Sequence, residues 1–553
     1  MKGISEYSKS PPPPFSKRGD SPLLFTNDLK FPRISSKFGS IRSSFPALYP
    51  LPSTLYPVVL LPTLTSLLLI LSYPKFNQGW LAWFALAPLT VAVWKAKDLK
   101  TALLGGLAAG FFFYLGILYW IYPTMRAGGV NVPVSLAGWA ALSLTLSVEF
   151  LVVSVFGFYL KKPGRAVWPY MFAAGWTLME WLKILVTLKG VWFPWFMLGY
   201  TQWGSPKIIQ IVSVTGTYGL SFAVALSGAL LGCALMRKGG IWKKAYGLLP
   251  ALILIGGLFA FGTAGLKKAG GAKLKGQAAF SMLQPSIELY QKWDERYARG
   301  IEERIERLLE RAGASKIIVW PENALPGWID EPQCRDWLKK VSAGTGTFNI
   351  VGSVSQGDGK HVAAFLLDEK GSVAASYYKR RLVPFGEYVP LRELLGRYLS
   401  VVSELGEFEK GTLNQKLFEA DGVKMGIGIC YESVFPYLAR SDVSKGADLL
   451  VNVTNDGWYL DTAAPYQHFL ANIFRAAENR KSLVRAANNG ISALIDPWGR
   501  ISAKTALNDY TILNVNAPLY ENPGKTFYVE HGDWFCWLCL LLAGAFLLAL
   551  VFI

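Results

Sequence analysis

The sequence predicts a multi-pass α-helical membrane domain joined to an extracytoplasmic α/β domain. Seven long apolar segments fill the first half of the 553-residue chain, and an eighth ends it. Residues 271–530 instead have the composition of a soluble domain, in which short β-type runs alternate with helical patterns. Such alternation is typical of a layered α/β core. Hydrophobic residues make up 52% of the chain and charged residues 17%, which excludes a disordered protein and disfavours a fully soluble one.

The membrane domain is predicted over residues 51–270, after a tail at residues 1–50. The tail has four consecutive prolines and many Ser, Lys and Arg residues, so we expect it to be disordered. Most apolar segments reach the length of about 20 residues that spans a bilayer. We therefore expect seven transmembrane helices and a C-terminal eighth at 534–553. The seven lie at 55–73, 79–94, 101–121, 134–160, 167–186, 208–235 and 245–265.

Net charge separates the two halves of the chain. The formal charge is +18, but residues 1–270 hold 25 basic and 6 acidic residues, whereas residues 271–553 hold 31 and 32. The excess indicates membrane orientation and argues against a nucleic-acid-binding face. Basic residues gather in alternate loops, at 95–100, 161–165 and 237–244. The positive-inside rule therefore places the N-terminus in the cytoplasm and the α/β domain outside it.

Cysteine and histidine are scarce. Five cysteines are scattered along the chain, and only three histidines occur. They form neither a disulfide scaffold nor a pattern of zinc ligands. We therefore expect no metal site and no cofactor.

The loop between the fifth and sixth apolar segments, from Lys189 to Gly204, is rich in aromatic residues. One interpretation is an aromatic belt at the membrane–water interface. The other is an arm that lines a lipid entrance to a site.

Within the α/β domain, apolar runs predict strands and one charged segment predicts a helix. The spacing of Ile301, Ile305 and Leu308 favours an amphipathic helix over 301–312. The predicted strands lie at 316–320, 349–355, 373–379, 423–430, 448–456, 482–488 and 492–497.

Cys430 closes an apolar strand and precedes Tyr431 and Glu432. A nucleophile at a sharp strand-to-helix turn is exposed while neighbouring N–H groups point at the substrate, although the usual GxSxG pattern of such a turn is absent. The alternative is a buried free cysteine without a role.

Two further charged groups follow predicted strands. Glu322, beside the apolar Trp320 and Trp328, is either a general base with a raised pKa or an acid at a helix N-terminus. Lys379 is either a cation that stabilises a thiolate and an oxyanion or part of a solvated basic run.

These groups occur in ordered motifs that resemble the carbon–nitrogen hydrolase (nitrilase) superfamily. The motifs are QPSIELYQKWDE around Trp293, WPENALP with Glu322, YYKRRLVPFGEYVP with Lys379 and Glu387, and ICYE with Cys430, Tyr431 and Glu432. NDGWY, PYQHF and RAANNGI extend the similarity. With the flanking apolar segments, residues 55–553 resemble the membrane-bound branch of that superfamily, the apolipoprotein N-acyltransferases.

The resemblance implies a nitrilase-like α-β-β-α sandwich for residues 271–530 and a Glu–Lys–Cys site. Glu322 is implied as general base, Lys379 as oxyanion and charge stabiliser, and Cys430 as nucleophile.

The same resemblance assigns supporting residues around that site. Glu387 would support Lys379, and Trp293 would lie at the substrate entrance. Tyr431 and Glu432 would shape the site beside the nucleophile.

The resemblance also implies the reaction, the last step of bacterial lipoprotein maturation. A fatty acyl chain would pass from the sn-1 ester of a membrane phospholipid to a cysteine thioester. It would then pass to the N-terminal amine of a diacylglyceryl-modified cysteine in an apolipoprotein. We expect a monomeric multi-pass protein of the bacterial inner membrane, with its catalytic domain on the periplasmic side and no nucleic-acid partner.

Two other functions stay open. A membrane-tethered amidase or nitrilase would use the same three residues on a small C–N substrate, but it would need only one anchor. A transporter would carry intramembrane charges on broken helices, and Glu149 and Glu180 are the acids inside the predicted spans.

Overall fold

The computed structural model describes most of the chain after the tail. The tail at 1–50 and Trp293 lie outside the described residues. The described ranges are 56–161, 166–188, 190, 192–288, 291–292, 294–389, 408–521 and 525–551.

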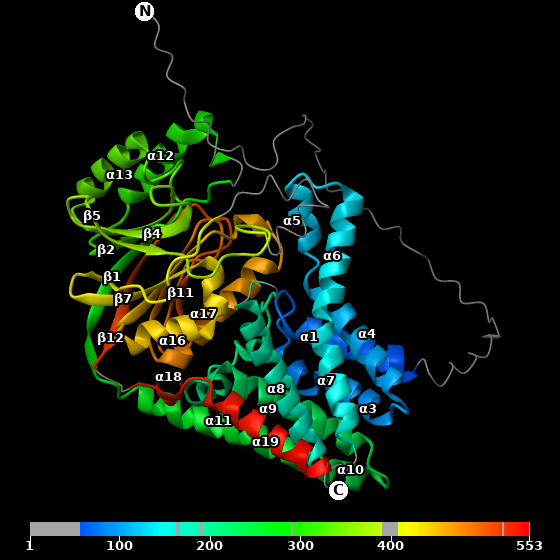
Figure 1. The fold of residues 1–553 in the computed structure, drawn as a ribbon. Coiled ribbons are helices and arrows are strands. Elements are labelled where there is room, and N and C mark those ends of the chain that lie inside the picture. The colour runs from blue at the N-terminus through cyan, green and yellow to red at the C-terminus, as the bar shows by residue number, and fades with distance from the viewer. Residues whose placement is uncertain are drawn as a thin grey trace, which may run out of the picture.

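The first half of the chain is a bundle of helices, and each predicted apolar segment coincides with a helix (Figure 1). The helices are α1 (Leu61–Ser72), α2 (Ala82–Ala85), α3 (Ala87–Lys95), α4 (Leu99–Ile117), α5 (Ile121–Ala127), α6 (Val132–Leu146), α7 (Val148–Tyr159), α8 (Trp168–Thr187), α9 (Val212–Leu235), α10 (Ile241–Tyr246) and α11 (Leu249–Ala269). The C-terminal α19 (Trp534–Val551) packs against α8 and α9.

Four described helical stretches are long and apolar enough to cross a membrane: Leu99–Ile117, Val132–Tyr159, Ile208–Leu235 and Ile241–Ala269. Three shorter apolar stretches accompany them, at Val58–Ser72, Gly79–Lys95 and Trp534–Ala549. Helix α8 has 20 residues but carries Glu180 and Lys183. Seven spans plus a C-terminal one therefore stay a prediction.

Polar caps and small residues explain the bundle locally. The Asp98 side chain accepts a hydrogen bond from the Thr101 N–H and begins α4. In α4, Gly106 and Gly110 face Ser154 and Ser147, and an added Cβ would lie only 2.6 Å from a serine atom at either glycine. Small residues thus allow α4 and α7 to approach closely, as is common between membrane helices.

Helix α9 contains a kink that only glycine permits. Gly216 has φ +65° and ψ 178°, a region of backbone space essentially restricted to glycine. The Thr217 N–H after the kink donates to Glu478 Oε1 at 2.9 Å. A Cβ on Gly216 would lie 2.6 Å from the Tyr528 ring.

The second half of the chain is an α-β-β-α sandwich, as the resemblance implied. One sheet has the order β12-β1-β2-β3-β4-β5, with parallel pairing in β1-β2-β3. Its strands are β1 (Leu274–Gln284), β2 (Ile317–Val319), β3 (Phe348–Ser355), β4 (His361–Leu367), β5 (Val373–Tyr378) and β12 (Thr511–Tyr520).

The second sheet has the order β11-β10-β9-β8-β7-β6, with parallel pairing in β7-β8-β9. Its strands are β6 (Phe418–Ala420), β7 (Val423–Ile429), β8 (Leu449–Thr454), β9 (Leu483–Ala487), β10 (Ala493–Ile495) and β11 (Ile501–Lys504).

Two helices cover the outer face of each sheet (Figure 1). Helices α12 (Glu295–Leu309) and α13 (Pro332–Thr345) cover the first sheet, where Ile305 and Leu338 join the core with Val351. Helices α16 (Pro436–Ser444) and α17 (Ala464–Asn479) cover the second.

Helix α17 also joins the two halves. Every residue of α17 except Tyr466 is buried, because the helix lies between the second sheet and the membrane half. Glu478 Oε1 accepts hydrogen bonds from Thr217 and from Arg475 Nη2 at 3.1 Å. Gln467 Oε1 accepts one from the Trp120 indole at 3.0 Å. Short α18 (Phe527–His531) packs beside this junction, against α9.

We predict that Gly216→Ala lowers the stability of the folded protein by about 2–5 kcal/mol, because it adds backbone strain and a clash with Tyr528. The apparent melting temperature in detergent, followed by tryptophan fluorescence, measures the effect. Gly256→Ala is the matched control, since a Cβ there meets nothing within 4 Å. Equal melting temperatures for the two variants would contradict the role of the kink.

Candidate active site

The three predicted catalytic residues each follow a strand and meet at one end of the sandwich. Glu322 comes after β2 and Lys379 directly after β5, both in the first sheet. Cys430 comes directly after β7, in the second sheet. The site is therefore assembled across the two sheets.

Cys430 begins the short 3₁₀ helix Cys430–Val434 and has φ +50°. A left-handed backbone at a non-glycine residue costs roughly 1–3 kcal/mol, so the surrounding structure must hold it. This is the predicted strand-to-helix turn, although the side chain is buried rather than exposed. All five cysteines are free and buried, and the charges of Glu322 and Lys379 act on the thiol of Cys430.

Lys379 is completely buried between two carboxylates. Its Nζ lies 2.9 Å from Glu322 Oε1 and 2.5 Å from Glu387 Oε1. The alternative of a solvated basic run is wrong, since its side chain has no exposed area. The second oxygen of Glu322 accepts the Asn455 N–H at 3.0 Å, and that of Glu387 accepts the Val383 N–H at 2.8 Å. The carboxylates are thus fixed at both oxygens.

The Glu322 carboxylate does not lie at a helix N-terminus. The described residues between 320 and 331 form turns, and α13 begins only at Pro332. Asn323, the next residue, has φ +51° and closes a left-handed turn. The helix-capping alternative for Glu322 is therefore wrong.

Electrostatics favour a charged lysine and a protonated thiol at rest. Burial opposes the charge of Lys379, but Glu322 and Glu387 outweigh it and raise the lysine pKa well above its usual value. Burial also raises the pKa of the Cys430 thiol; the Glu322 charge adds to this effect and Lys379 opposes it. The thiol therefore needs a base to become a nucleophile at neutral pH.

Glu432 does not face the reacting atoms but ties the two sheets together. Its Oε2 accepts the Ile429 N–H at 2.8 Å and the Tyr377 hydroxyl at 2.6 Å. Its Oε1 accepts the N–H groups of Arg380 and Arg381. Glu432 therefore fixes the segment after Lys379 against the turn that carries Cys430.

Tyr431 points toward the membrane half. Its ring lies nearly parallel to the rings of Phe193 and Trp195, with centroids 6.0 and 6.3 Å away. The Tyr388 hydroxyl donates to the Gly190 carbonyl oxygen at 3.0 Å. We name residues 192–202 the aromatic arm. These contacts favour the interpretation of the loop as an arm at a site over that of an interfacial belt.

Sequence reasoning missed Lys292. Its buried Nζ donates to the Asn323 carbonyl oxygen at 2.6 Å and so holds the turn after Glu322. Burial lowers the lysine pKa to about 7, against the effect of the Glu322 charge. Its position in the QKW motif was the available signal.

A buried polar cluster beneath the site was also missed. His468 Nδ1 lies 2.8 Å from Asp456 Oδ1, and Arg485 Nη2 lies 2.9 Å from Asp456 Oδ2. Burial would raise the pKa of Asp456, but Arg485 and then His468 lower it to about 2. The His468 ring stacks on Trp195. The NDGWY and PYQHF motifs were the signal, and their partners are distant in sequence.

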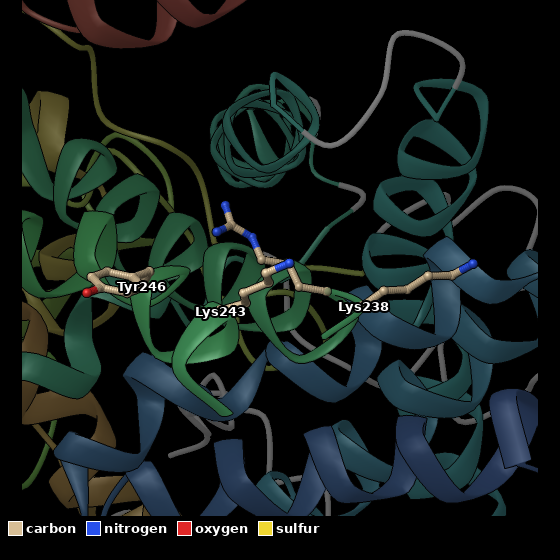
Figure 2. A pocket seen from close by; sticks show the side chains of 4 residues that line it. Lys238, Lys243 and Tyr246 are labelled. Carbon is tan, nitrogen blue, oxygen red and sulfur yellow. The ribbon is translucent and has the colours of Figure 1, made fainter. Parts of the chain in front are cut away.

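No group of three or more His, Cys, Asp or Glu side chains able to hold a metal occurs among the described residues. A cavity of about 450 Å³ lies around α10, lined by Arg237, Lys238, Lys243 and Tyr246 (Figure 2). It contains none of the catalytic candidates.

Two family profiles match the chain. The profile described as Carbon-nitrogen hydrolase matches residues 281–519. The profile described as Apolipoprotein N-acyltransferase N-terminal domain matches residues 65–230. Together they cover the α/β sandwich and most of the helical bundle.

Proteins named apolipoprotein N-acyltransferase resemble the chain over most of its length. That of Geobacter metallireducens is 36% identical, over 89% of this chain and 94% of its own. That of Brucella melitensis is 31% identical, over 75% of this chain and 79% of its own. Among solved structures, a CN-hydrolase superfamily protein of Xanthomonas campestris aligns with TM-score 0.35 and 20% identity, over 47% of this chain and 95% of its own.

Similarity at this level extends through both halves and the connection between them. The chain therefore belongs to the apolipoprotein N-acyltransferase family, whose membrane-embedded enzymes carry a carbon–nitrogen hydrolase domain.

Proposed function

We propose that this chain N-acylates apolipoproteins through a thioester on Cys430, with a membrane phospholipid as acyl donor. The acceptor is the N-terminal amine of a diacylglyceryl-modified cysteine. One observation carries the proposal: the buried Cys430 lies close enough to the Glu322–Lys379 ion pair for both charges to act on its thiol, and aromatic rings of the membrane half stack on the next residue, Tyr431. The proposed nucleophile and an aromatic wall supplied by the membrane half thus coincide.

In the first half-reaction, Glu322 takes the proton of the Cys430 thiol, and the sulfur attacks the sn-1 ester carbonyl. The tetrahedral oxyanion is stabilised by the Lys379 ammonium and by the Tyr431 N–H. One such donor contributes about 3–4 kcal/mol. The C–O bond then breaks, and the lysophospholipid leaves with the proton from Glu322. An acyl thioester on Cys430 remains, with Glu387 holding Lys379 in place.

In the second half-reaction, the free amine of the modified cysteine attacks the thioester carbonyl. The same donors stabilise the second oxyanion. The C–S bond breaks, and the proton lost by the amine returns to the sulfur through Glu322. The product is an N-acylated lipoprotein, and the scheme is ping-pong.

The membrane half suits this chemistry better than that of an amidase. A small water-soluble C–N substrate needs no aromatic arm from a helical bundle. The transporter alternative fares no better, because Glu149 and Glu180 bind the aromatic arm instead of lining a path. We further propose a monomer with its catalytic half on the periplasmic face of the inner membrane, in accord with the basic residues of alternate loops and the positive-inside rule.

We predict that the purified protein incubated with phospholipid, without acceptor, gains the mass of one fatty acyl chain on Cys430. Hydroxylamine or a diacylglyceryl-cysteine peptide should remove it, since both attack thioesters. Intact and peptide mass spectrometry measure the adduct, and Cys430→Ala should carry none. Cys334→Ala is the matched control. An adduct that persists in Cys430→Ala would contradict the assignment of the nucleophile.

A second prediction is that Glu322→Gln changes the rates of two reactions of Cys430 in opposite directions. Loss of the carboxylate charge lowers the thiol pKa, so alkylation of Cys430 by iodoacetamide should become faster at neutral pH. Thioester formation should fall by about 10²–10⁴-fold, because the general base is lost.

The two rates are followed by mass spectrometry between pH 6 and pH 9. This range includes the usual pKa of a thiol, about 8.5. Glu288→Gln serves as the control on a neighbouring surface segment. Parallel loss of alkylation and of thioester formation would mean that Glu322 only maintains the fold of the site.

A further inference from the structure

The aromatic arm is irregular backbone inside the hydrophobic half of the protein. Residues 192–197 form no helix or strand, and Trp195, Phe196 and Met197 are buried. Backbone N–H and C=O groups at such a depth must find partners within the protein, because lipid offers none. The partners of the arm therefore show what holds it.

A buried ion pair between two membrane helices supplies two of these partners. Lys183 on α8 lies 3.4 Å from Glu149 on α7, and both side chains are less than a tenth exposed. Lys183 Nζ also donates to the Phe196 carbonyl oxygen. Glu149 Oε1 accepts the indole N–H of Trp192 at 2.9 Å. Each member of the ion pair therefore makes a hydrogen bond to the aromatic arm.

Further polar groups in the bundle bind the same segment. Glu180 Oε1, one turn before Lys183 on α8, accepts the Leu198 N–H at 2.7 Å. The Tyr73 hydroxyl donates to the Met197 carbonyl oxygen at 2.8 Å. The Tyr114 hydroxyl donates to Glu149 Oε2 at 2.7 Å, which completes the coordination of that carboxylate.

The same stretch of the arm reaches Tyr431, the residue next to Cys430. The rings of Phe193 and Trp195 stack on each other with centroids 5.2 Å apart and continue the stack onto Tyr431. Trp195 also stacks on His468 at 5.2 Å. The segment anchored by the ion pair is therefore the segment that sets the wall beside Cys430.

We propose that Glu149 and Lys183 are positioning residues for acyl transfer, which hold the aromatic arm so that its rings stay against Tyr431. This inference rests on the proposed function. The pair is costly in an apolar bundle, because both charges lose their hydration. Anchoring of the arm is the compensating use that the contacts reveal.

The test separates fold stability from arm position. Lys183→Met and Glu149→Gln each leave one buried charge without its partner, and each should lower the apparent melting temperature. The double variant removes both charges, and replacement of a whole buried ion pair is often neutral for stability. Its melting temperature should therefore recover, while the Phe196 carbonyl oxygen still lacks its donor.

In the double variant, single-turnover thioester formation on Cys430 should stay about tenfold to hundredfold slower than in the unchanged protein, since small misplacements cost rate on this scale. Alkylation of Cys430 by iodoacetamide should be unchanged, because the ion pairs of Lys379 do not involve the arm. Lys183→Arg should retain the rate, because arginine keeps the positive charge beside Glu149 and can still donate a hydrogen bond to the Phe196 carbonyl oxygen.

Two further variants keep the test decisive. Trp192→Phe leaves both charges and the fold intact but removes the bond to Glu149, so it should slow thioester formation without a change in melting temperature. Ser66→Ala is the control, since its hydroxyl binds Ala109 between α1 and α4, away from the arm. If the double variant does not fold, the rate of thioester formation in Trp192→Phe tests the positioning role instead.

An unchanged rate in Trp192→Phe, or in a folded double variant, would overturn the positioning role. The thioester on the unchanged protein is a separate outcome. Its absence there would refute the proposed function itself, whatever the variants do.

Discussion

A buried ammonium persists in a protein interior only beside carboxylates, and that requirement at Lys379 sets the layout of the whole site. Its two partners come from different segments, Glu322 after β2 and Glu387 beyond β5. Their own second oxygens bind backbone N–H groups, so neutralisation of one cation fixes three pieces of chain. The charge of Lys379 therefore organises the residues around it, and it is the charge to which we assign stabilisation of the oxyanion.

The membrane half is part of the site and not merely its anchor. Helix α17 lies buried between the second sheet and the bundle, and the kink of α9 at Gly216 presents the Thr217 N–H to Glu478. Above this junction the aromatic arm reaches the turn of the nucleophile. Under the proposed function this arrangement would be an advantage, because a thioester in a site closed off from water is protected from hydrolysis.

Much of the site could be predicted from sequence because it sits where local patterns are strong. Cys430 follows a pure apolar strand, and the structure has the predicted strand-to-helix turn. The helix N-terminal role for Glu322 and the solvated basic run for Lys379 were wrong. Both residues bind partners that come from other segments of the chain, which local sequence does not show. Helix α17 was missed because all of its residues except Tyr466 are buried, and polar side chains such as Gln467 and Glu478 bind groups of the membrane half. Lys183 binds a backbone carbonyl, which leaves no signature in sequence.

The stack of Phe193, Trp195 and Tyr431 joins residues that belong to different halves and lie more than two hundred positions apart. Substitution of one ring changes the shape that the other two must fit. We therefore expect the effects of substitutions at these three positions to depend on one another, and a catalytic half taken from a relative would have to fit these rings. The two halves thus form one matched unit, and buried residues of the bundle and of the second sheet join one continuous hydrophobic core.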